Sequence, residues 1–238
     1  ASSIDARKNF TDYLMRKAGR PIAPLKKFQR ISGGYSKVTV AAELEQKDDF
    51  GWGTQLLIRM DVKDGPTNFT VADEYPLLQL LHQSAVPVAK PFACETDTQI
   101  LGQPFLVSAL VRGNSAASGD TTVAAWGNDA QLRSSVGIQL AQALGALHSI
   151  KPANIDARPM VDQLRDYIGH WRSLWLKLGA VAEPGLAVAF DWLQENIPRN
   201  IENLSYIHGD FAPYNALQYD GELTAVIDWE FVHVGDPA

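Results

Sequence analysis

The side chains best suited to chemistry lie near the C-terminal end of this 238-residue sequence. Positions 208–215 read His-Gly-Asp-Phe-Ala-Pro-Tyr-Asn, and positions 225–230 read Ala-Val-Ile-Asp-Trp-Glu. Asp210 offers a carboxylate that can accept the proton of an attacking hydroxyl. Asn215 and Asp228 offer an amide oxygen and a second carboxylate, which are hard ligands of the kind that Mg²⁺ prefers. Together the two segments predict one base and two metal ligands.

The spacing of these residues indicates phosphoryl transfer. Asn215 follows Asp210 by five positions, as in the kinase catalytic loop H-R-D-x-x-x-x-N, and Asp228 stands where kinases place the aspartate of D-F-G. Phosphoryl transfer needs positioned groups and neutralised charge rather than covalent help from the protein. The alternative, a turn at His208 and a strand-end cap at Asp228, leaves the joint spacing unexplained. We expect His208 to hold the loop by a hydrogen bond rather than to act in catalysis.

A glycine turn near the N-terminus is a candidate for contact with nucleotide phosphates. It consists of Ser32, Gly33, Gly34, Tyr35 and Ser36. Glycines let backbone amides approach a phosphate closely, so this turn would close over a nucleotide. Taken alone, the same residues are equally typical of an ordinary β-hairpin turn. The sequence has no G-x-x-x-x-G-K-[ST] motif, which excludes a P-loop enzyme.

Arg59 and Glu74 are a candidate ion pair for the same nucleotide. Arg59 lies at the strand position where kinases usually keep a lysine, and its guanidinium can hold phosphate oxygens with two hydrogen bonds. Glu74, near the start of the next helix, would orient Arg59; the alternative is two unrelated surface charges. Because proline is tolerated only in the first turn of a helix, Pro76 predicts a helix that begins near Asp73, with Glu74 near a fraying end.

Beyond these residues, the chain divides into a strand-rich half and a helix-rich half. Strands are expected over 25–31, 35–43, 54–60, around 92 and over 104–110. Helices are expected over 3–17, 73–83, 131–150, 161–178 and 185–196. This order predicts an α+β, two-lobed, kinase-like fold, with an antiparallel sheet in the N-terminal lobe and a mainly helical C-terminal lobe.

The expected lobes meet at a hinge. The nucleotide-binding lobe is predicted over 1–108, the hinge and linker over 109–122, and the helical lobe with the catalytic loop over 123–238. At the hinge we expect Ala109 and Val111 to lend backbone donors and acceptors to the adenine edge.

Motifs in this order resemble the aminoglycoside phosphotransferase family, which shares the protein-kinase fold. They are Ser32-Gly33-Gly34-Tyr35-Ser36, Leu57-Ile58-Arg59, Glu74-Tyr75, Val86-Pro87-Val88, Leu144-Gly145-Ala146-Leu147-His148, His208-Gly209-Asp210, Ile227-Asp228-Trp229-Glu230 and Gly235-Asp236-Pro237. Arg59 and the Trp-Glu pair after Asp228 are similar to the subgroup related to domains fused to acyl-CoA dehydrogenases. In this family, helices after the Gly-Asp-Pro segment largely hold the acceptor. Because the sequence stops at Ala238, the resemblance implies an incomplete C-terminal lobe.

The resemblance implies a kinase that uses ATP and Mg²⁺ to phosphorylate a hydroxyl of a small molecule. Two other hypotheses stay open: a nucleotide-binding regulator without turnover, because of Arg59 and Pro76, and a metal-dependent phosphoesterase that uses His208, Asp210, Asp228 and His233. The acceptor also stays open among aminoglycosides, choline-like alcohols, sugars and hydroxyacyl-CoA thioesters.

Composition narrows the partners and the compartment. The net charge of −6 argues against nucleic acid as the main partner. No apolar run is as long as a membrane span, and no secretory signal opens the chain, so we expect a cytoplasmic protein. Cys94 is the only cysteine, which excludes an internal disulfide and a cysteine-based zinc site.

Overall fold

The computed structural model of the chain describes residues 3–31, 36–45, 51–63, 69–116, 129–153, 156, 158–177, 183–199, 201 and 203–237. The chain splits into two compact units. The first is Ala1–Ala146 with His208–Phe231, and the second is Leu147–Ile207 with Val232–Ala238. The segment with the candidate catalytic loop therefore belongs to the same unit as the N-terminal residues.

The predicted division into lobes at 1–108 and 123–238 stays a prediction. Positions 117–122 of the predicted linker lie outside the described residues. Within the part of the chain that the structure describes, no helix is long and apolar enough to cross a membrane.

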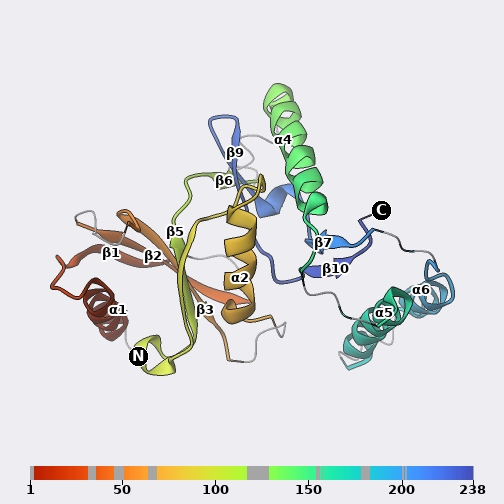
Figure 1. Ribbon diagram of the computed structural model, residues 1–238, viewed down its shortest axis with the longest axis horizontal. Coiled ribbons are helices and arrows are strands. Elements are labelled where there is room, and N and C mark those ends of the chain that lie inside the picture. The colour runs from red at the N-terminus through yellow and green to blue at the C-terminus, as the bar shows by residue number, and fades with distance from the viewer. Residues whose placement is uncertain are drawn as a thin grey trace. The chain divides into compact units, whose positions relative to one another are not determined.

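Five antiparallel strands form the sheet of the first unit, in the order β1-β2-β3-β5-β4 (Figure 1). They are β1 (Leu25–Ile31), β2 (Lys37–Leu44), β3 (Gln55–Asp61), β4 (Pro91–Glu95) and β5 (Phe105–Ala109), with a short helix α3 (Thr98–Leu101) between the last two. Each strand coincides with a predicted one apart from residues at its ends. The predicted α+β class with an antiparallel N-terminal sheet is confirmed.

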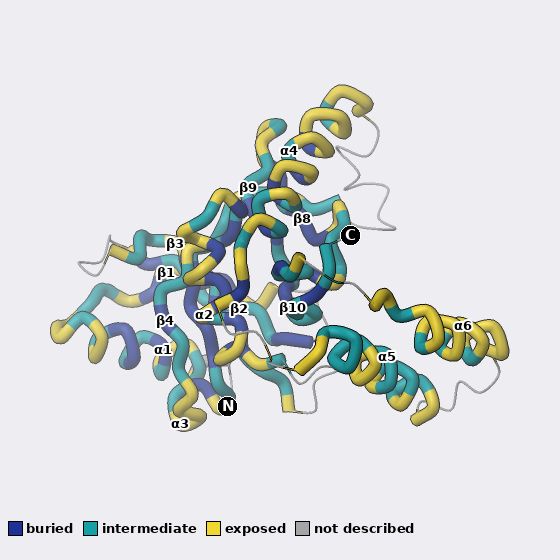
Figure 2. Tube along the Cα trace, turned by 45° about the vertical axis from the view of Figure 1, so that its right-hand side comes forward, coloured by how far each residue is buried: buried dark blue, intermediate teal, exposed yellow. Residues whose placement is uncertain are grey.

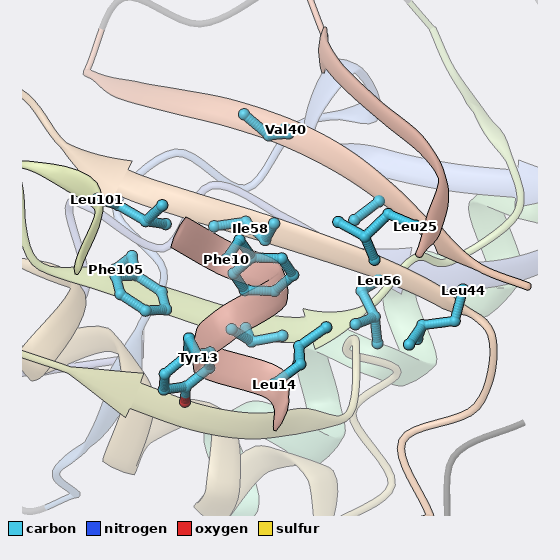
Figure 3. Close-up of a cluster of buried hydrophobic side chains, with 12 residues drawn as sticks. Phe10, Tyr13, Leu14, Leu25, Val40, Leu44, Leu56, Ile58, Leu101 and Phe105 are labelled. Carbon is cyan, nitrogen blue, oxygen red and sulfur yellow. The ribbon is translucent and has the colours of Figure 1, made fainter. Parts of the chain in front are cut away.

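Helix α1 (Ser3–Ala18), the predicted leading helix, packs on one face of this sheet. Side chains alternate between the faces of a strand, so Leu56 and Ile58 of β3 point to the same face, where both are fully buried. Phe10 of α1 is fully buried in the same cluster, as Figure 3 shows. By the same alternation, Arg59 of β3 lies on the opposite face of the sheet.

Helix α2 (Val71–His82) lies on the Arg59 side and begins earlier than expected. Thr70 caps it: the Thr70 hydroxyl accepts a hydrogen bond from the Asp73 amide, and the Asp73 carboxylate accepts one from the Thr70 amide. The prediction of a start near Asp73 is therefore wrong, and Pro76 lies inside the helix. Because Pro76 is exposed, the hydrogen bond that proline cannot donate is lost on the solvent side.

A hairpin in the first unit carries the two C-terminal motifs. Its strands are β8 (Ala216–Tyr219) and β9 (Glu222–Val226). Asp220 and Gly221 connect them with φ values of 53° and 83°, the two positive values that a tight type I′ turn requires. A third strand, β6 (Asn114–Ser115), pairs with β8. Apart from the strand-like run before Asp228, these strands were not predicted.

Helix α4 (Ala130–Ser149) supports this hairpin from the side. Val136 and Leu140 of α4 pack with Ala216 in a small apolar cluster. The Gln139 side chain donates to the Gly221 carbonyl at 2.8 Å and accepts from the Leu223 amide at 2.9 Å. The apolar cluster around Val136 and the two hydrogen bonds of the Gln139 side chain therefore fix the position of the hairpin turn.

The second unit contains a pair of helices and a pair of strands. They are α5 (Met160–Lys177), α6 (Pro184–Glu195), β7 (Ser205–Ile207) and β10 (His233–Gly235). Both predicted helices are confirmed, although neither has a buried residue (Figure 2). Strands β7 and β10 pair antiparallel, and the Tyr167 ring stacks on His233 with 4.7 Å between ring centroids.

Candidate active site

The hairpin brings Asn215 and Asp228 to the same end of two paired strands. Strand β8 starts directly after Asn215, and β9 ends two positions before Asp228. The Ile227 amide donates to the Asn215 carbonyl at 2.9 Å, so the pairing continues beyond the strands. Asn215 accepts this backbone hydrogen bond, and Asp228 directly follows its donor, Ile227. The two predicted metal ligands therefore lie close together at the end of the hairpin.

The loop before β8 ties Asn215 to Asp210. Its last residues form a short 3₁₀ turn, η1 (Pro213–Asn215). The Asn215 side-chain amide donates to the Asp210 carbonyl at 3.0 Å and to Asp210 Oδ2 at 2.9 Å. Because both N–H groups of this amide face Asp210, its Oδ1 atom is the one left for a metal. Asn215 is 6% exposed, so this arrangement is held by burial as well.

Tyr214 makes the other contact of the Asp210 carboxylate. Its hydroxyl donates to Asp210 Oδ1 at 2.5 Å, and the residue is 41% exposed. This hydrogen bond is the main cause that raises the pKa of the Tyr214 phenol, and the nearby charges of Asp210 and Asp228 act in the same direction. Spacing arguments did not identify Tyr214, because kinase-type loops are recognised by their Asp and Asn alone.

His208 is buried beneath the loop and fixes it through hydrogen bonds of its ring, which is the structural role predicted for it. Its Nε2–H donates to the Ile227 carbonyl at 3.0 Å, and its Nδ1 accepts from the Asp210 amide at 3.2 Å. Burial lowers the pKa of His208, which favours the neutral ring that this pattern needs. The Trp229 ring lies beside it, with 4.5 Å between centroids. Since both ring nitrogens are engaged, His208 is not available as a metal ligand, which counts against the phosphoesterase hypothesis.

Gly209 is required by the close approach of Phe231. Its φ is +83°, and a Cβ atom there would lie 2.4 Å from the Phe231 carbonyl oxygen and 2.6 Å from the Phe231 Cβ. No side chain fits at these distances. The glycine of this motif therefore serves the packing of the loop against the segment that follows Asp228.

A comparison of two glycines tests this packing. Gly221 has the same φ of +83°, but among the described residues a Cβ there would meet only Leu132 Cδ1, at 3.7 Å. Both alanine substitutions carry the left-handed cost of about 1–2 kcal/mol, and Gly209→Ala adds overpacking worth about 1–3 kcal/mol. Urea denaturation should therefore show a clearly larger loss of unfolding free energy for Gly209→Ala than for Gly221→Ala. Equal losses would contradict the close contact with Phe231.

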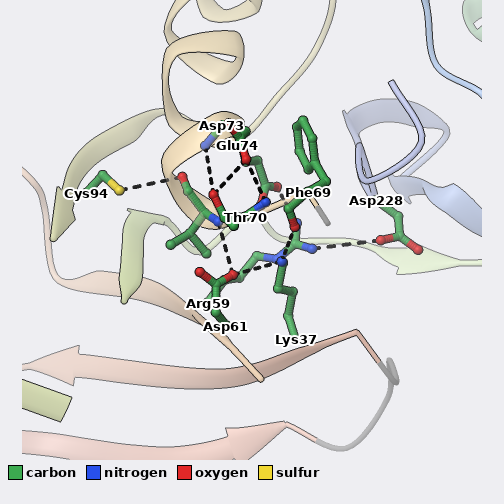
Figure 4. Close-up of polar contacts among 10 residues, drawn as sticks. Lys37, Arg59, Asp61, Phe69, Thr70, Asp73, Glu74, Cys94 and Asp228 are labelled. Atoms are coloured by element: carbon green, nitrogen blue, oxygen red, sulfur yellow. Dashed lines mark hydrogen bonds and ion pairs between the residues drawn. The ribbon is translucent and has the colours of Figure 1, made fainter. Parts of the chain in front are cut away.

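Arg59 lies between Glu74 and Asp228 (Figure 4). Its Nη1 donates to Glu74 Oε1 at 2.5 Å, and its Nη2 lies 3.8 Å from Asp228 Oδ1. Glu74 is 1% exposed, and its Oε2 has no hydrogen-bond partner among the described residues. Burial raises the pKa of Glu74, while the charges of Arg59 and Lys37 oppose that rise. The pair predicted from the sequence is present, and Glu74 is a buried group rather than one at a fraying end.

Lys37, which is buried, and Asp61, which is half-buried, form a second ion pair beside the first, which the sequence did not reveal. Lys37 Nζ lies 2.8 Å from Asp61 Oδ1 and donates to the Phe69 carbonyl at 2.6 Å. Asp61 Oδ1 also accepts from the Val71 amide at 3.1 Å. These contacts hold the first residues of α2 against β2 and β3 (Figure 4), so they fix the helix turn that carries Glu74.

A double-mutant cycle measures how strongly Arg59 and Glu74 are coupled. Arg59→Met leaves a buried carboxylate without its partner, which costs about 3–5 kcal/mol of unfolding free energy. We expect the double variant Arg59→Met, Glu74→Gln to lose clearly less than the sum of the single losses. The exposed pair Lys26–Glu43 (side chains 67% and 29% exposed) is the control, with an expected coupling of about 1 kcal/mol or less. Additive losses at Arg59 and Glu74 would rule out the pair in solution.

The donor set at the end of the hairpin suits Mg²⁺. Asn215 Oδ1 and the Asp228 carboxylate are hard oxygen donors, and the Asp228 side chain is 39% exposed. Asp228 also has a φ of 67°, a left-handed conformation that aspartate tolerates better than most residues. Mg²⁺ is usually held by one or two protein carboxylates together with phosphate oxygens. The residues present therefore fit a site that holds Mg²⁺ jointly with a nucleotide.

The other predicted nucleotide contacts are only partly described. Ser32, Gly33, Gly34 and Tyr35 lie outside the described residues, and Ser36 is buried just before β2. The Ala109 amide donates to the Lys90 carbonyl at 2.9 Å, so this N–H is already engaged. Val111 follows the end of β5. Their contact with adenine stays a prediction.

The chain matches the family model of the phosphotransferase enzyme family over residues 27–238. A curated relative, acyl-CoA dehydrogenase family member 11 of Homo sapiens, is 28% identical over 184 residues, which cover 72% of this chain and 22% of that protein. The chain thus spans less than a quarter of the length of the curated relatives that it matches.

Two solved structures show the same fold. A thermostable mutant of aminoglycoside phosphotransferase APH(4)-Ia, in a ternary complex with ADP and hygromycin B, has a TM-score of 0.62 and 17% identity, covering 95% of this chain and 72% of that chain. Macrolide 2'-phosphotransferase from Brachybacterium faecium has a TM-score of 0.60 and 22% identity, covering 97% of this chain and 74% of that chain. The predicted kinase-like fold is confirmed by these likenesses.

Proposed function

Because the chain belongs to the phosphotransferase enzyme family, we propose that it transfers the γ-phosphate of ATP, bound with Mg²⁺, to a hydroxyl group of a small molecule. The observation that carries this proposal is the arrangement of Asp210, Asn215 and Asp228 around the β8–β9 hairpin: Asn215 is hydrogen-bonded to Asp210, and Asp228 follows Ile227, whose amide donates to the Asn215 carbonyl. This group combines a base, a neutral oxygen donor and a carboxylate, which is the set that phosphoryl transfer requires.

Asp210 is the proposed catalytic residue. Its carboxylate orients the acceptor hydroxyl and accepts its proton as the oxygen attacks phosphorus. The Asn215 amide fixes the direction of the carboxylate through Oδ2, and the His208 ring fixes the backbone of the same residue. Asp210 therefore loses little freedom when an acceptor binds, because the protein has already ordered it.

Arg59, Asn215 and Asp228 form the proposed nucleotide end of the site. Asn215 and Asp228 would hold Mg²⁺, which when bound neutralises part of the charge on the phosphates. Arg59 is held by Glu74 through Nη1, and its Nη2 lies on the side of Asp228. A guanidinium held in this way can give N–H groups to phosphate oxygens. Ala109, Val111 and the turn at Ser32–Ser36 are the proposed contacts with the rest of the nucleotide.

The acceptor is proposed only as a class. Structures of similar fold were solved with ADP and hygromycin B, or are named for action on macrolides, and the curated relatives are named as acyl-CoA dehydrogenase family members. Hydroxylated small molecules, from aminoglycosides, sugars and choline-like alcohols to hydroxyacyl-CoA thioesters, are therefore the acceptors to test.

The test is a screen of ADP release by the protein with Mg²⁺ and ATP against a panel of these acceptors. We expect at least one acceptor to stimulate ADP release, and we expect removal of Mg²⁺ to abolish the stimulation. Binding of Mg·ATP without stimulation by any acceptor would instead favour a nucleotide-binding regulator. Failure to bind Mg·ATP would reject both.

A further inference from the structure

Both carboxylate oxygens of Asp210 already accept hydrogen bonds from the loop that carries it. Oδ2 accepts from the Asn215 amide at 2.9 Å, and Oδ1 accepts from the Tyr214 hydroxyl at 2.5 Å. If Asp210 is the base of the proposed function, on which this inference rests, an acceptor hydroxyl must donate to one of these oxygens. A phenol O–H is chemically the same kind of donor as an acceptor O–H.

The two contacts differ in how easily they can be exchanged. Asn215 is 6% exposed, also donates to the Asp210 backbone carbonyl, and is tied to Ile227 through its own carbonyl. Tyr214 is 41% exposed and holds Oδ1 through a single hydroxyl. Rotation of an exposed side chain costs little compared with rearrangement of a buried one. Oδ2 is therefore the fixed side of Asp210, and Oδ1 is the side open to exchange.

We infer that the Tyr214 hydroxyl occupies the place of the acceptor hydroxyl on Asp210 until an acceptor displaces it. In this position Tyr214 keeps the carboxylate oriented and competes with water for Oδ1. Tyr214 is a positioning residue that acts through Asp210, and it favours transfer to an acceptor over hydrolysis of ATP. Loss of its hydroxyl should therefore affect the reaction with water differently from the reaction with an acceptor.

The reaction with water follows the same path as transfer. The water oxygen forms a bond to the γ-phosphorus, and the bond from that phosphorus to the β–γ bridging oxygen breaks. ADP leaves with the electron pair, and the water proton passes to Asp210 and then to solvent. Hydrolysis therefore needs a water molecule that donates to Oδ1 of Asp210, and the Tyr214 hydroxyl competes with water for this oxygen.

The test is ATP hydrolysis without any acceptor, which needs no knowledge of the substrate. Tyr214→Phe removes only the hydroxyl, and we expect it to raise hydrolysis by about two- to tenfold, as the loss of one hydrogen bond allows, with unchanged affinity for Mg·ATP. Tyr219→Phe is the matched control. Tyr219 is 39% exposed, and the Arg112 guanidinium lies over its ring, 3.7 Å from the ring centroid. We expect it to hydrolyse ATP like the wild type.

The double variant Tyr214→Phe, Asp210→Asn assigns the increase to Asp210. If Tyr214 acts through Asp210, the double variant hydrolyses ATP no faster than the single variant Asp210→Asn. If Tyr214→Phe still raises the hydrolysis rate in the Asp210→Asn background, the inference is wrong. Hydrolysis by Tyr214→Phe at or below the wild-type rate, with Mg·ATP affinity intact, would also overturn it. The proposed function would fail in a different way, by absence of Mg·ATP binding in all of these proteins or by ADP release that no acceptor stimulates in the wild type.

A spectroscopic measurement tests the contact itself, independently of turnover. In protein labelled with 3-fluorotyrosine, the ¹⁹F resonance of Tyr214 is the one missing from Tyr214→Phe. We expect Asp210→Asn to shift this resonance and Tyr219→Phe to leave it in place. A Tyr214 resonance that does not respond to Asp210→Asn would show that the hydroxyl does not donate to Asp210 in solution.

Discussion

Asp210→Asn is expected to lower kcat by about 10²–10⁴-fold, the usual effect of removing a general base. The affinity for Mg·ATP should stay nearly the same, because the proposed role of Asp210 is toward the acceptor hydroxyl and the transition state. Asparagine keeps the shape of the side chain, and its remaining oxygen can still accept from Asn215 Nδ2. Steady-state kinetics with an acceptor from the ADP-release screen, together with calorimetric titration of Mg·ATP, measures both effects.

The contrast between kcat and binding distinguishes a base from a structural residue. A merely structural Asp210 would change nucleotide affinity or unfolding free energy along with the rate. If Asp210→Asn turns over at the wild-type rate with Mg·ATP bound normally, the role of the 208–215 loop in catalysis is wrong.

Asp228→Asn is expected to weaken the binding of Mg·ATP by about 10- to 100-fold, since the charge of the ligands largely sets the affinity for a hard cation. Asparagine tolerates the left-handed backbone at φ 67°, so the substitution removes charge without adding strain. Metal-free ATP should bind as well as before or better, because a carboxylate near the phosphates repels them. Calorimetric titrations with and without Mg²⁺ compare the two directly.

Asp220→Asn provides the control for this substitution. Asp220 has a φ of 53° and lies at the other end of the same hairpin, so the change is chemically and conformationally alike. It should leave both affinities unchanged. A fall of equal size for Mg·ATP and metal-free ATP in Asp228→Asn would mean that Asp228 supports the fold and does not bind the metal.

Local patterns predicted most of the helices and strands of the fold. The strands of the sheet and the helices α1, α4, α5 and α6 lie where alternation and helical periodicity place them. The start of α2 differs from the prediction because the capping box of Thr70 and Asp73 sets the first residue of the helix, whereas Pro76 alone indicates a later start. The Thr-x-x-Asp pattern of this capping box is present in the sequence, so the start of α2 is predictable from local residues.

The turn of the β8–β9 hairpin is also predictable from the sequence. Asp-Gly is one of the residue pairs typical of a type I′ turn, so Asp220 and Gly221 predict the pairing of Tyr219 with Glu222 and of Gln218 with Leu223. Without a shift, this register would pair Ala216 with Ala225. The irregularity between Leu217 and Gln218 moves the partner of Ala216 to Val226, which places Asn215 beside Ile227 and close to Asp228. The spacing between the two motifs therefore reflects the length of one hairpin.

Contacts that depend on register or on a short turn could not be predicted. Lys37 meets Asp61 because β2 and β3 pair with Lys37 opposite Asp61, and pairing of two strands across a long connection is not determined by local sequence. Tyr214 meets Asp210 because of the η1 turn, whose geometry follows from packing against the hairpin. Neither contact leaves a characteristic spacing in the chain.

The proposed activity is tested most directly by ³¹P NMR of a reaction that contains the protein, Mg·ATP and an acceptor from the screen. Transfer to a hydroxyl converts the γ-phosphate into a phosphate monoester of the acceptor, so the ester resonance should grow in the same amount as ADP. The ester should be absent when Asp210→Asn replaces the wild type for the same time. ADP that forms together with inorganic phosphate alone, with every acceptor in the panel, would contradict the proposed phosphotransferase.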